Sequence, residues 1–373
     1  MSAPLAGIVA VELGASVAAP AAGQILGDLG AEVWKIEKAD GDDARKWGPP
    51  FVDGASATFQ ALNRNKRSVV CDLRDEKQRS ALVGFILEKA DVVLQNLRPG
   101  QVEALGLGAD RFIGEKPGLV YCNIGAFGRG GPLSGRPGYD PLMQAFGGIM
   151  SAVGEEGRPP VRVGPSIVDV GTALWAVIGI MSALYRKKET GKGGIVEVSL
   201  FETAATWMQM YAAQYSASGE LPRRAGSGQA AIVPYRAYRT ADGDLVVAAG
   251  NNSLFRKLCG VLGYPGWADE PRFRDNADRV EHAAILYAMI EAEMVKRPSA
   301  QWNDLLERAG VPCAQVQNVG QMLAHPQMNA LGLLQPVAGC SIPLIGLPIS
   351  FDGERPDAGQ AAPALGAHTK DFL

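Results

Sequence analysis

The chain has 373 residues, of which 47% are hydrophobic and 20% charged, and its formal net charge is −3. The length predicts two domains, the composition excludes a disordered chain, and the charge excludes a general nucleic-acid-binding surface. The five cysteines are scattered without CxxC spacing, which argues against a disulfide framework or a zinc site and favours a reducing compartment.

Two further features bear on where the protein resides. The opening residues, MSAPLAGIVAVELG, lack the basic segment and cleavage pattern of a secretory signal. The most apolar run, residues 170–185, is shorter than the roughly 20 residues of a membrane-spanning helix, and RKKETGKGG follows it. A basic last turn before glycines is typical of a helix C-terminus. We therefore expect a buried core helix in a cytoplasmic protein.

In chain order, apolar runs that resemble strands alternate with helical patterns. Strands are expected at residues 8–13, 31–37, 67–73 and 91–97, and an amphipathic helix at residues 75–90. This alternation predicts an α/β fold with a Rossmann-like, doubly wound parallel sheet. The turn after the first strand contains only Gly14 of a GxGxxG fingerprint, which disfavours ordinary dinucleotide binding.

The pattern changes in the second half of the chain. The polar segment LPRRAGSGQAA, residues 221–231, marks a domain boundary, and a hairpin turning at Asp242-Gly243 follows it. Two amphipathic helical stretches come next, so we expect a smaller α+β domain. The predicted division is a large α/β domain at residues 1–200, a small domain at 221–320, and a C-terminal segment at 321–373 that returns to the large domain.

Several searches for catalytic motifs find nothing. The chain contains no P-loop, no GxSxG nucleophile elbow and no HExxH zinc motif. Residues 226–231, GSGQAA, match GxGxxA formally, but no strand precedes them, and we interpret them as a flexible loop. We expect no metal site.

One carboxylate stands out within GRPGYDPLMQAFGG. Asp140 follows a glycine-rich approach and precedes an apolar helical run, while the three histidines, His282, His325 and His368, are all remote in sequence. A carboxylate at this place either caps the helix that it precedes or acts as the reacting group itself. Asp169 also stands at a helix start, and we interpret it as a cap.

Six ordered segments resemble the class III CoA-transferases, the CaiB/BaiF family that includes formyl-CoA transferase. They are GIVAVELGASVAAPAAGQILGDLGAEVWKIEKADGDDAR, LNRNKRSVVCDLR, ADVVLQNLRPG, GRPGYDPLMQAFGG, KKETGKGGIVEVSLFE and PALGAHT. The resemblance implies a homodimer of two interlocked open rings, with residues 1–200 binding CoA and carrying the catalytic group. It also implies transfer of CoA from an acyl-CoA donor to a small carboxylic acid.

The resemblance places the catalytic aspartate at Asp140, which would form an aspartyl anhydride and then an aspartyl-CoA thioester. No permanently bound cofactor is implied, because coenzyme A enters as part of the substrate. The resemblance also assigns CoA contacts to residues at or just after the ends of four of the expected strands. These are Val17, Ala18, Lys38, Cys71, Asp72, Leu73, Arg74, Asn96, Leu97 and Arg98. Lys38 stands where relatives commonly have arginine, and Ala104 stands near another such place, so the phosphate contacts are expected to depend more on Arg74 and Arg98.

Other interpretations stay open. AGSGQ, residues 225–229, is either a lid over the intermediate or a linker, and residues 127–131 either supply backbone amides or form a turn. The related α-methylacyl-CoA racemases read GHD where this chain has Gly138-Tyr139-Asp140, so the racemase alternative lacks its histidine base. A non-catalytic CoA-binding protein is the remaining alternative, and it would need Lys38 and Arg98 without Asp140.

Overall fold

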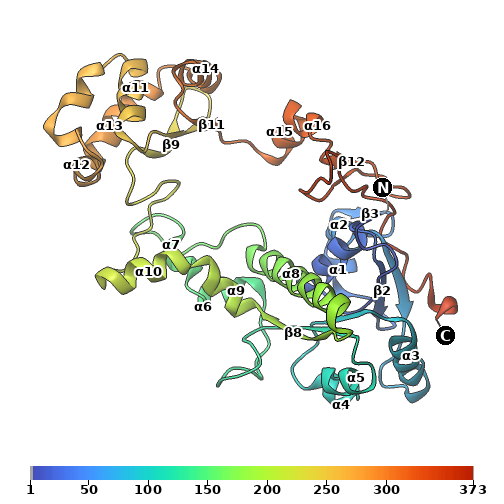
Figure 1. Cartoon of the computed structure of the whole chain (residues 1–373). Coiled ribbons are helices and arrows are strands. Elements are labelled where there is room, and N and C mark those ends of the chain that lie inside the picture. Colours follow the sequence, from blue (N-terminus) through green and yellow to red (C-terminus); the bar gives the residue numbers. More distant parts are fainter. Residues whose placement is uncertain (1–2, 373) are drawn as a thin grey trace. The chain divides into compact units, whose positions relative to one another are not determined.

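The computed structural model describes residues 3–372, which form two compact units (Figure 1). The first unit comprises the chain up to Ile149, Val163–Met210, and the chain from His325 onward; the second comprises Met150–Arg162 and Tyr211–Ala324. The short segment Met150–Arg162, expected in the large domain, thus packs with the second unit. The C-terminal segment packs with the first.

A six-stranded parallel sheet organises the first unit. Its strands are β1 (Val9–Leu13), β2 (Glu32–Glu37), β5 (Lys66–Val70), β6 (Val92–Gln95), β7 (Val120–Gly125) and β8 (Gly194–Ser199). Their order is β5-β2-β1-β6-β7-β8, and every neighbouring pair is parallel. The predicted α/β fold with a parallel sheet is confirmed. The chain winds one way from β1 to β5 and the other way from β6 to β8, so the order reverses between β1 and β6.

Helices cover both faces of this sheet. One face carries α3 (Glu76–Lys89), α4 (Gln101–Ala104) and α5 (Ala109–Glu115), and the other carries α1 (Ala18–Asp28) and α8 (Ile167–Thr190). This unit also contains α2 (Ala57–Asn63), α6 (Asp140–Phe146), α9 (Leu200–Trp207) and α16 (Pro326–Ala330). Two more helices, α7 (Ile149–Ala152) and α10 (Gln209–Ser218), begin in this unit, but most of their residues belong to the second. Two-residue strands form two small hairpins, β3 (Phe51–Val52) with β4 (Ala55–Ser56) and β12 (Leu334–Gln335) with β13 (Leu344–Ile345).

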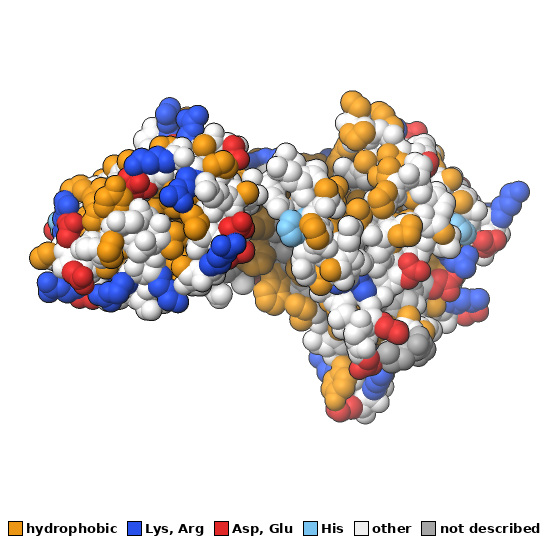
Figure 2. Space-filling model, turned by 90° about the horizontal axis from the view of Figure 1, so that it is seen from above, with side chains coloured by type: hydrophobic (Ala, Val, Ile, Leu, Met, Phe, Trp, Pro, Cys, Tyr) orange, Lys and Arg blue, Asp and Glu red, His pale blue; other side chains and the backbone are white. Residues whose placement is uncertain are grey.

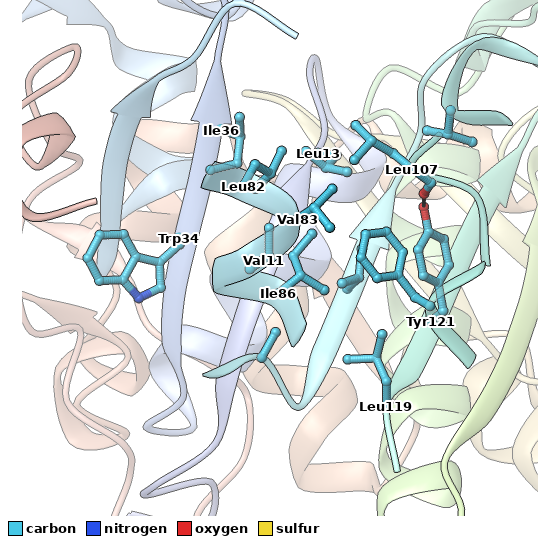
Figure 3. Close-up of a cluster of buried hydrophobic side chains, with 14 of the residues drawn as sticks. Val11, Leu13, Trp34, Ile36, Leu82, Val83, Ile86, Leu107, Leu119 and Tyr121 are labelled. Carbon is cyan, nitrogen blue, oxygen red and sulfur yellow. Dashed lines mark hydrogen bonds between the residues drawn. The ribbon is translucent and has the colours of Figure 1, made fainter. Parts of the chain in front are cut away.

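The core on the α3 face explains why these segments fold together. Val11 and Leu13 of β1 meet Leu82 and Ile86 of α3, and all four side chains are buried (Figure 3). Each such side chain contributes about 1.5–3 kcal/mol when fully buried. Farther along the sheet, the Tyr121 hydroxyl donates a 2.6 Å hydrogen bond to the Leu107 carbonyl, which satisfies a polar atom in an apolar surrounding (Figure 3).

The C-terminal segment covers the outer edge of β5. The backbone N–H of His368 donates to the Ser68 carbonyl at 2.9 Å, and the Ser68 N–H donates to His368 Nδ1 at 3.2 Å. The Thr369 hydroxyl accepts from the N–H of Val70 at 3.0 Å. PALGAHT therefore supplies hydrogen-bond partners to backbone groups of β5, an edge strand that would otherwise leave them unpaired.

Helix α8 is the apolar run seen in the sequence. Among the described residues it is the one helix whose length and hydropathy would allow it to cross a membrane. Half of its most apolar stretch is buried inside the protein, where it packs on α1, α9, β7 and β8. This burial is typical of a core helix.

The second unit has a different architecture. Its antiparallel sheet has the order β11-β10-β9, formed by β9 (Tyr235–Arg239), β10 (Asp244–Ala248) and β11 (Cys313–Gln315). The predicted hairpin around Asp242-Gly243 is confirmed by the pairing of β9 with β10. Five helices accompany the sheet: α11 (Asn252–Leu262), α12 (Asn276–Glu281), α13 (Ala283–Met294), α14 (Ser299–Ala309) and α15 (Val319–Ala324).

Basic and acidic side chains are mixed on one face of the molecule. Figure 2 shows basic and acidic groups interspersed on the face in view, as expected for 36 Lys+Arg and 39 Asp+Glu. A face of this kind lacks the one-signed field that binds nucleic acid.

Candidate active site

All ten residues predicted to contact CoA follow the carboxyl ends of neighbouring strands. Val17 and Ala18 come after β1, Lys38 after β2, the Cys71 group after β5 and the Asn96 group after β6. These four strands are adjacent in the order β5-β2-β1-β6, so the structure brings the four loops to one edge of the sheet. Ligands of doubly wound proteins bind at this edge, beside the point where the strand order reverses.

The loop between β1 and α1 is held by side chains from two other loops. Asn96 accepts from the Ala15 N–H at 3.0 Å and donates to the Ala15 carbonyl at 2.9 Å. Asp42 accepts from the N–H of Ser16 at 3.1 Å. The side chain of Asn96 is therefore occupied in shaping this loop, and its contribution to ligand binding is positional.

Glycine is required where this loop passes α1. A Cβ on Gly14 would lie 2.5 Å from Cβ of Ala19, well inside the distance at which two carbon atoms can rest. The loop therefore packs directly on the helix, and its backbone reaches the N-terminus of α1 at Val17 and Ala18. Unsatisfied N–H groups at such a terminus favour anions.

Three of the predicted CoA contacts are cationic side chains. Lys38 is exposed and forms a 2.7 Å ion pair with Asp43, whose hydrogen bond raises the pKa of Lys38. Exposed pairs contribute only about 0–1 kcal/mol, so a phosphate can displace Asp43 at little cost. Arg74 and Arg98 are also exposed, and no ion pair among the described residues engages either guanidinium.

The other predicted contacts differ in character. Cys71 is buried, and desolvation raises the pKa of its thiol to about 11, so it is not a nucleophile at neutral pH. Asp72 accepts a 3.0 Å hydrogen bond from the N–H of Arg74, which shapes the turn between them. Leu73 and Leu97 pack against the core of the sheet, so they offer mainly backbone groups and apolar surface.

A buried ionic network, which the sequence patterns did not predict, lies behind the loops. Lys35 of β2 lies 2.8 Å from Glu12 Oε1 and 2.9 Å from Asp42 Oδ2, and it also donates to the Gly14 carbonyl at 2.8 Å. Lys66 of β5 lies 2.7 Å from Glu12 Oε2. Charged residues inside the apolar runs IVAVEL and EVWKIE were the available signal, because a charge in a buried strand needs a partner.

The electrostatics of the two lysines differ. Burial opposes the charged form of Lys35, but Glu12 and Asp42 outweigh it and hold its pKa above the usual value. Desolvation dominates at Lys66 and lowers its pKa to about 8. The network links the strands to the loop at Gly14, so the shape of that loop depends on charges buried in the sheet.

Asp140 occupies a buried position between two helices. It begins α6, with only 2% of its surface exposed, and it does not cap that helix. Its Oδ2 accepts from the N–H groups of Val168 at 2.8 Å and Asp169 at 3.2 Å, and its Oδ1 accepts from Gln144 Nε2 at 2.6 Å. The helix that its carboxylate caps is α8, which starts 27 residues farther along the chain.

Asp169 has the contrasting environment. It lies in the first turn of α8 and is half-buried, and no residue described by the structure donates a hydrogen bond to its carboxylate. Desolvation, followed by the charge of Asp140, raises its pKa to about 7. The cap expected at Asp169 is thus supplied by Asp140, while the carboxylate of Asp169 keeps its lone pairs free.

Two glycine-rich segments flank this region in the sequence. In the second unit, Ala225 bridges to Glu155 and the N–H of Gly226 donates to Gly154 at 2.8 Å. In the first unit, Phe127 packs against Phe146 and Phe201. The first segment is also held at its other end, where the N–H of Gln229 donates to the Tyr235 carbonyl at 3.2 Å. The second segment is anchored by its aromatic residue.

No metal chemistry is indicated within residues 3–372. The described His, Cys, Asp and Glu side chains form no group of three or more that could hold a metal ion.

The fold defines the class: an α/β protein whose parallel sheet brings four loops together at its carboxyl edge. The chain belongs to CoA-transferase family III, whose family model matches residues 5–369. The resemblance to the CaiB/BaiF family is confirmed, and the protein is a CoA-transferase.

Named relatives agree with this assignment. Acetyl-CoA:oxalate CoA-transferase of Acetobacter aceti is 36% identical, over 99% of this chain and 96% of the relative. Human succinyl-CoA:glutarate CoA-transferase is 34% identical, over 99% of this chain and 85% of the relative. The crystal structure of a CAIB/BAIF family protein from Brucella suis is 36% identical, with a TM-score of 0.90 over 100% of this chain and 98% of that one.

Proposed function

We propose that this protein transfers CoA from an acyl-CoA donor to a small carboxylic acid through covalent intermediates on Asp169. The sequence pattern had pointed to Asp140. The observation that carries the proposal is the contrast between the two carboxylates. Both oxygens of Asp140 accept hydrogen bonds in a buried site, whereas those of Asp169 accept none from residues 3–372. A nucleophile needs an accessible lone pair, and a partly desolvated carboxylate is more basic than one in water.

The reaction needs no proton transfer. The Asp169 carboxylate attacks the thioester carbonyl, forming a C–O bond and expelling CoA thiolate, which leaves a mixed anhydride. The thiolate then attacks Cγ of Asp169, forming a C–S bond and releasing the donor acid as its carboxylate. An acceptor carboxylate displaces the thiolate to form a second anhydride, and thiolate attack on the acceptor carbonyl regenerates Asp169. These steps require no histidine base.

CoA would lie across the four loops at the carboxyl edge of the sheet. The 3'-phosphate and diphosphate require cations and backbone amides, which Arg98, Arg74, Lys38 and the N-terminus of α1 supply. Coenzyme A is then a substrate that leaves with each product, and no cofactor stays bound. The donor and acceptor named for the relatives are dicarboxylic acids or their short acyl counterparts, so we propose acids of this size as substrates.

The racemase alternative receives no support from the site. Tyr139 occupies the position of the racemase histidine, and 62% of its side chain is exposed. A phenol lacks the basic nitrogen of an imidazole and is a poor base for removing a proton beside a thioester.

We also propose that the enzyme is a homodimer of interlocked rings. The support is an apolar surface on the first unit, where α8 exposes Val170, Leu174, Trp175 and Ile178 by 43–53%. The spacing places these side chains along one side of the helix, and apolar surface of this extent marks an interaction site.

Peptide mapping tests the choice of nucleophile. Trypsin cleaves after Arg129, Arg162 and Arg186, and proline blocks the sites at residues 136 and 158, so Asp140 and Asp169 fall on the separate peptides 130–162 and 163–186. The enzyme is incubated with succinyl-CoA, quenched with borohydride or hydroxylamine, and digested. We expect the mass change on peptide 163–186 and its loss in the Asp169→Asn variant. A label on peptide 130–162 would return the role to Asp140, and no label on either peptide would contradict covalent catalysis.

A further inference from the structure

The first turn of α8 is held by a carboxylate from another helix. The second and third residues of α8, Val168 and Asp169, both donate their backbone N–H groups to Oδ2 of Asp140. Ser166, the residue before the helix, makes no side-chain capping bond. Asp140 therefore does from α6 what a cap usually does from within its own helix, and it fixes the backbone that carries the Asp169 side chain.

Gln144 in turn fixes Asp140. Its Nε2 donates to Asp140 Oδ1 at 2.6 Å and to the Val163 carbonyl at 3.3 Å, while its Oε1 accepts from the Val163 N–H at 2.8 Å. The side chain is fully buried. These three hydrogen bonds hold the Gln144 amide in one orientation. That orientation in turn fixes the carboxylate of Asp140.

We propose that Asp140 and Gln144 are positioning residues of CoA transfer, which together hold the Asp169 nucleophile at the start of α8. The inference rests on the proposed function in one respect, that Asp169 is the nucleophile. A nucleophile must be held near its attack position, and a displacement of about 1 Å can cost on the order of a hundredfold in rate. Nothing in the described part of the chain anchors the carboxylate of Asp169 directly, so its placement depends on the backbone of this turn.

Asp140 also sets the charge beside the nucleophile. Burial raises the pKa of Asp169, and the negative charge of Asp140 raises it further. The acidic groups on the other elements packed against α8 are bonded elsewhere: Glu202 of α9 to Ser199, Asp28 of α1 to Arg64, and Glu197 of β8 to Arg129. On β7, burial raises the pKa of Tyr121 and Cys122, so both are uncharged at neutral pH.

Two substitutions separate position from charge. Asp140→Asn keeps an oxygen that can cap α8 but removes the charge and places an amide against the Gln144 amide. We expect kcat to fall about ten- to a hundredfold, and the acid limb of the pH profile to move about half a unit or more toward lower pH. Gln144→Met keeps the charge and removes the orienting bonds. We expect a similar fall in kcat with the acid limb unchanged.

A double variant provides the rescue. In Asp140→Asn/Gln144→Glu the direction of the hydrogen bond is reversed, because the amide introduced at position 140 donates to the carboxylate introduced at position 144 while its oxygen still faces α8. The single variants lower log kcat relative to wild type. We expect the double variant to recover at least about a third of that decrease, since the paired geometry is restored. Asp304→Asn, an exposed aspartate on α14 of the second unit, is the matched control and should leave the kinetics unchanged.

The outcomes are distinguishable. Wild-type kcat and pH profile in Asp140→Asn, or a double variant no better than the single ones, would overturn the positioning role while leaving Asp169 as nucleophile. An inactive Asp140→Asn beside an active Asp169→Asn would overturn the proposed function itself. Thermal melting and CoA affinity are measured for each variant, and a variant that loses activity only because it has lost its melting transition counts against the inference.

Discussion

Oδ2 of Asp140 accepts a 3.2 Å hydrogen bond from the backbone N–H of Asp169. The two carboxylates that compete for the role of nucleophile therefore meet at one helix end, and the bond runs from the backbone of one to the side chain of the other. The carboxylate that accepts it is buried and saturated, and the carboxylate on the donor residue is free. This asymmetry is the basis for proposing Asp140 as a positioning residue and Asp169 as the nucleophile.

The first prediction concerns the pH dependence of transfer. In the proposed mechanism only the ionised carboxylate of Asp169 attacks, and the pKa of this group is raised to about 7. We therefore expect kcat/KM to rise about tenfold per pH unit below pH 6 and to level off above about pH 8. The measurement uses an acceptor acid that is ionised throughout this range. Dephospho-CoA thioesters serve as the control, because they lack the 3'-phosphate monoester that titrates near pH 6. A flat profile with both donors would contradict Asp169 as the titrating group.

The second prediction is that the nucleophile destabilises the fold. The pKa of Asp169 is about 7 in the folded protein and about 3.9 in the unfolded chain, so the folded state retains a proton that the unfolded state loses between these values. Wild-type stability thus falls as pH rises from about 4 to 7, relative to Asp169→Asn, and the difference is constant above pH 7. Because the group is half-buried, we expect a gain of about 1–3 kcal/mol for Asp169→Asn at pH 8. Urea unfolding at pH 5, 6.5 and 8 measures it; an equal gain at all three would exclude this cause.

The third prediction concerns CoA binding. Arg98→Ala should weaken CoA by about ten- to a hundredfold, because a hydrogen bond to a charged group contributes roughly 1.5–3 kcal/mol. Lys38→Ala should have a smaller effect, since Lys38 first has to leave Asp43. Calorimetry with CoA and dephospho-CoA identifies which residue contacts the 3'-phosphate. Exposed Arg308 on α14 offers a matched Arg→Ala control. Unchanged affinity in Arg98→Ala would show that Arg98 is a solvated surface residue that does not contact CoA.

The fourth prediction concerns the buried ionic network. Glu12→Gln leaves Lys35 and Lys66 without their shared carboxylate, and removing one partner of a buried pair costs about 3–5 kcal/mol. We expect a correspondingly lower midpoint of chemical unfolding. Glu115→Gln, which breaks an exposed pair with Arg111, should cost less than about 1 kcal/mol. Equal losses in the two variants would mean that burial does not decide the energy of these pairs.

The fifth prediction concerns assembly. Interlocked rings cannot separate without partial unfolding, so we expect a dimer at every practical concentration. Two differently tagged preparations, purified separately and mixed under native conditions, should form no hybrid dimers until denaturant begins to unfold the chain. Hybrids that appear within minutes would contradict the interlocked arrangement, and a monomer in sedimentation would contradict any dimer. Neither result would bear on the chemistry at Asp169.

Much of this protein could be deduced from local patterns. The runs that predict strands at residues 8–13 and 31–37 became β1 and β2 to within one residue at each end, and the helix expected at residues 75–90 became α3. A buried parallel strand needs a continuous apolar run, and a half-exposed helix needs polar residues at the positions that face solvent. Both patterns can be recognised from residues that are close in sequence. The family segments likewise lie in order along the chain.

The roles of individual polar residues depended on the fold. Asp140 lies two residues after a glycine and precedes Pro141, as a cap or a nucleophile would, but its hydrogen-bond partners in α8 lie 28 and 29 residues away. The side chain of Asn96 holds the backbone of Ala15, which lies 81 residues earlier. Glu12 of β1 forms an ion pair with Lys66 of β5, and β2 lies between these two strands. A carboxylate is a cap when amides surround it and a nucleophile when its lone pairs stay free. Only the packing of α6 on α8 decides between these, because hydrogen bonds of this kind are made across space and not along the chain.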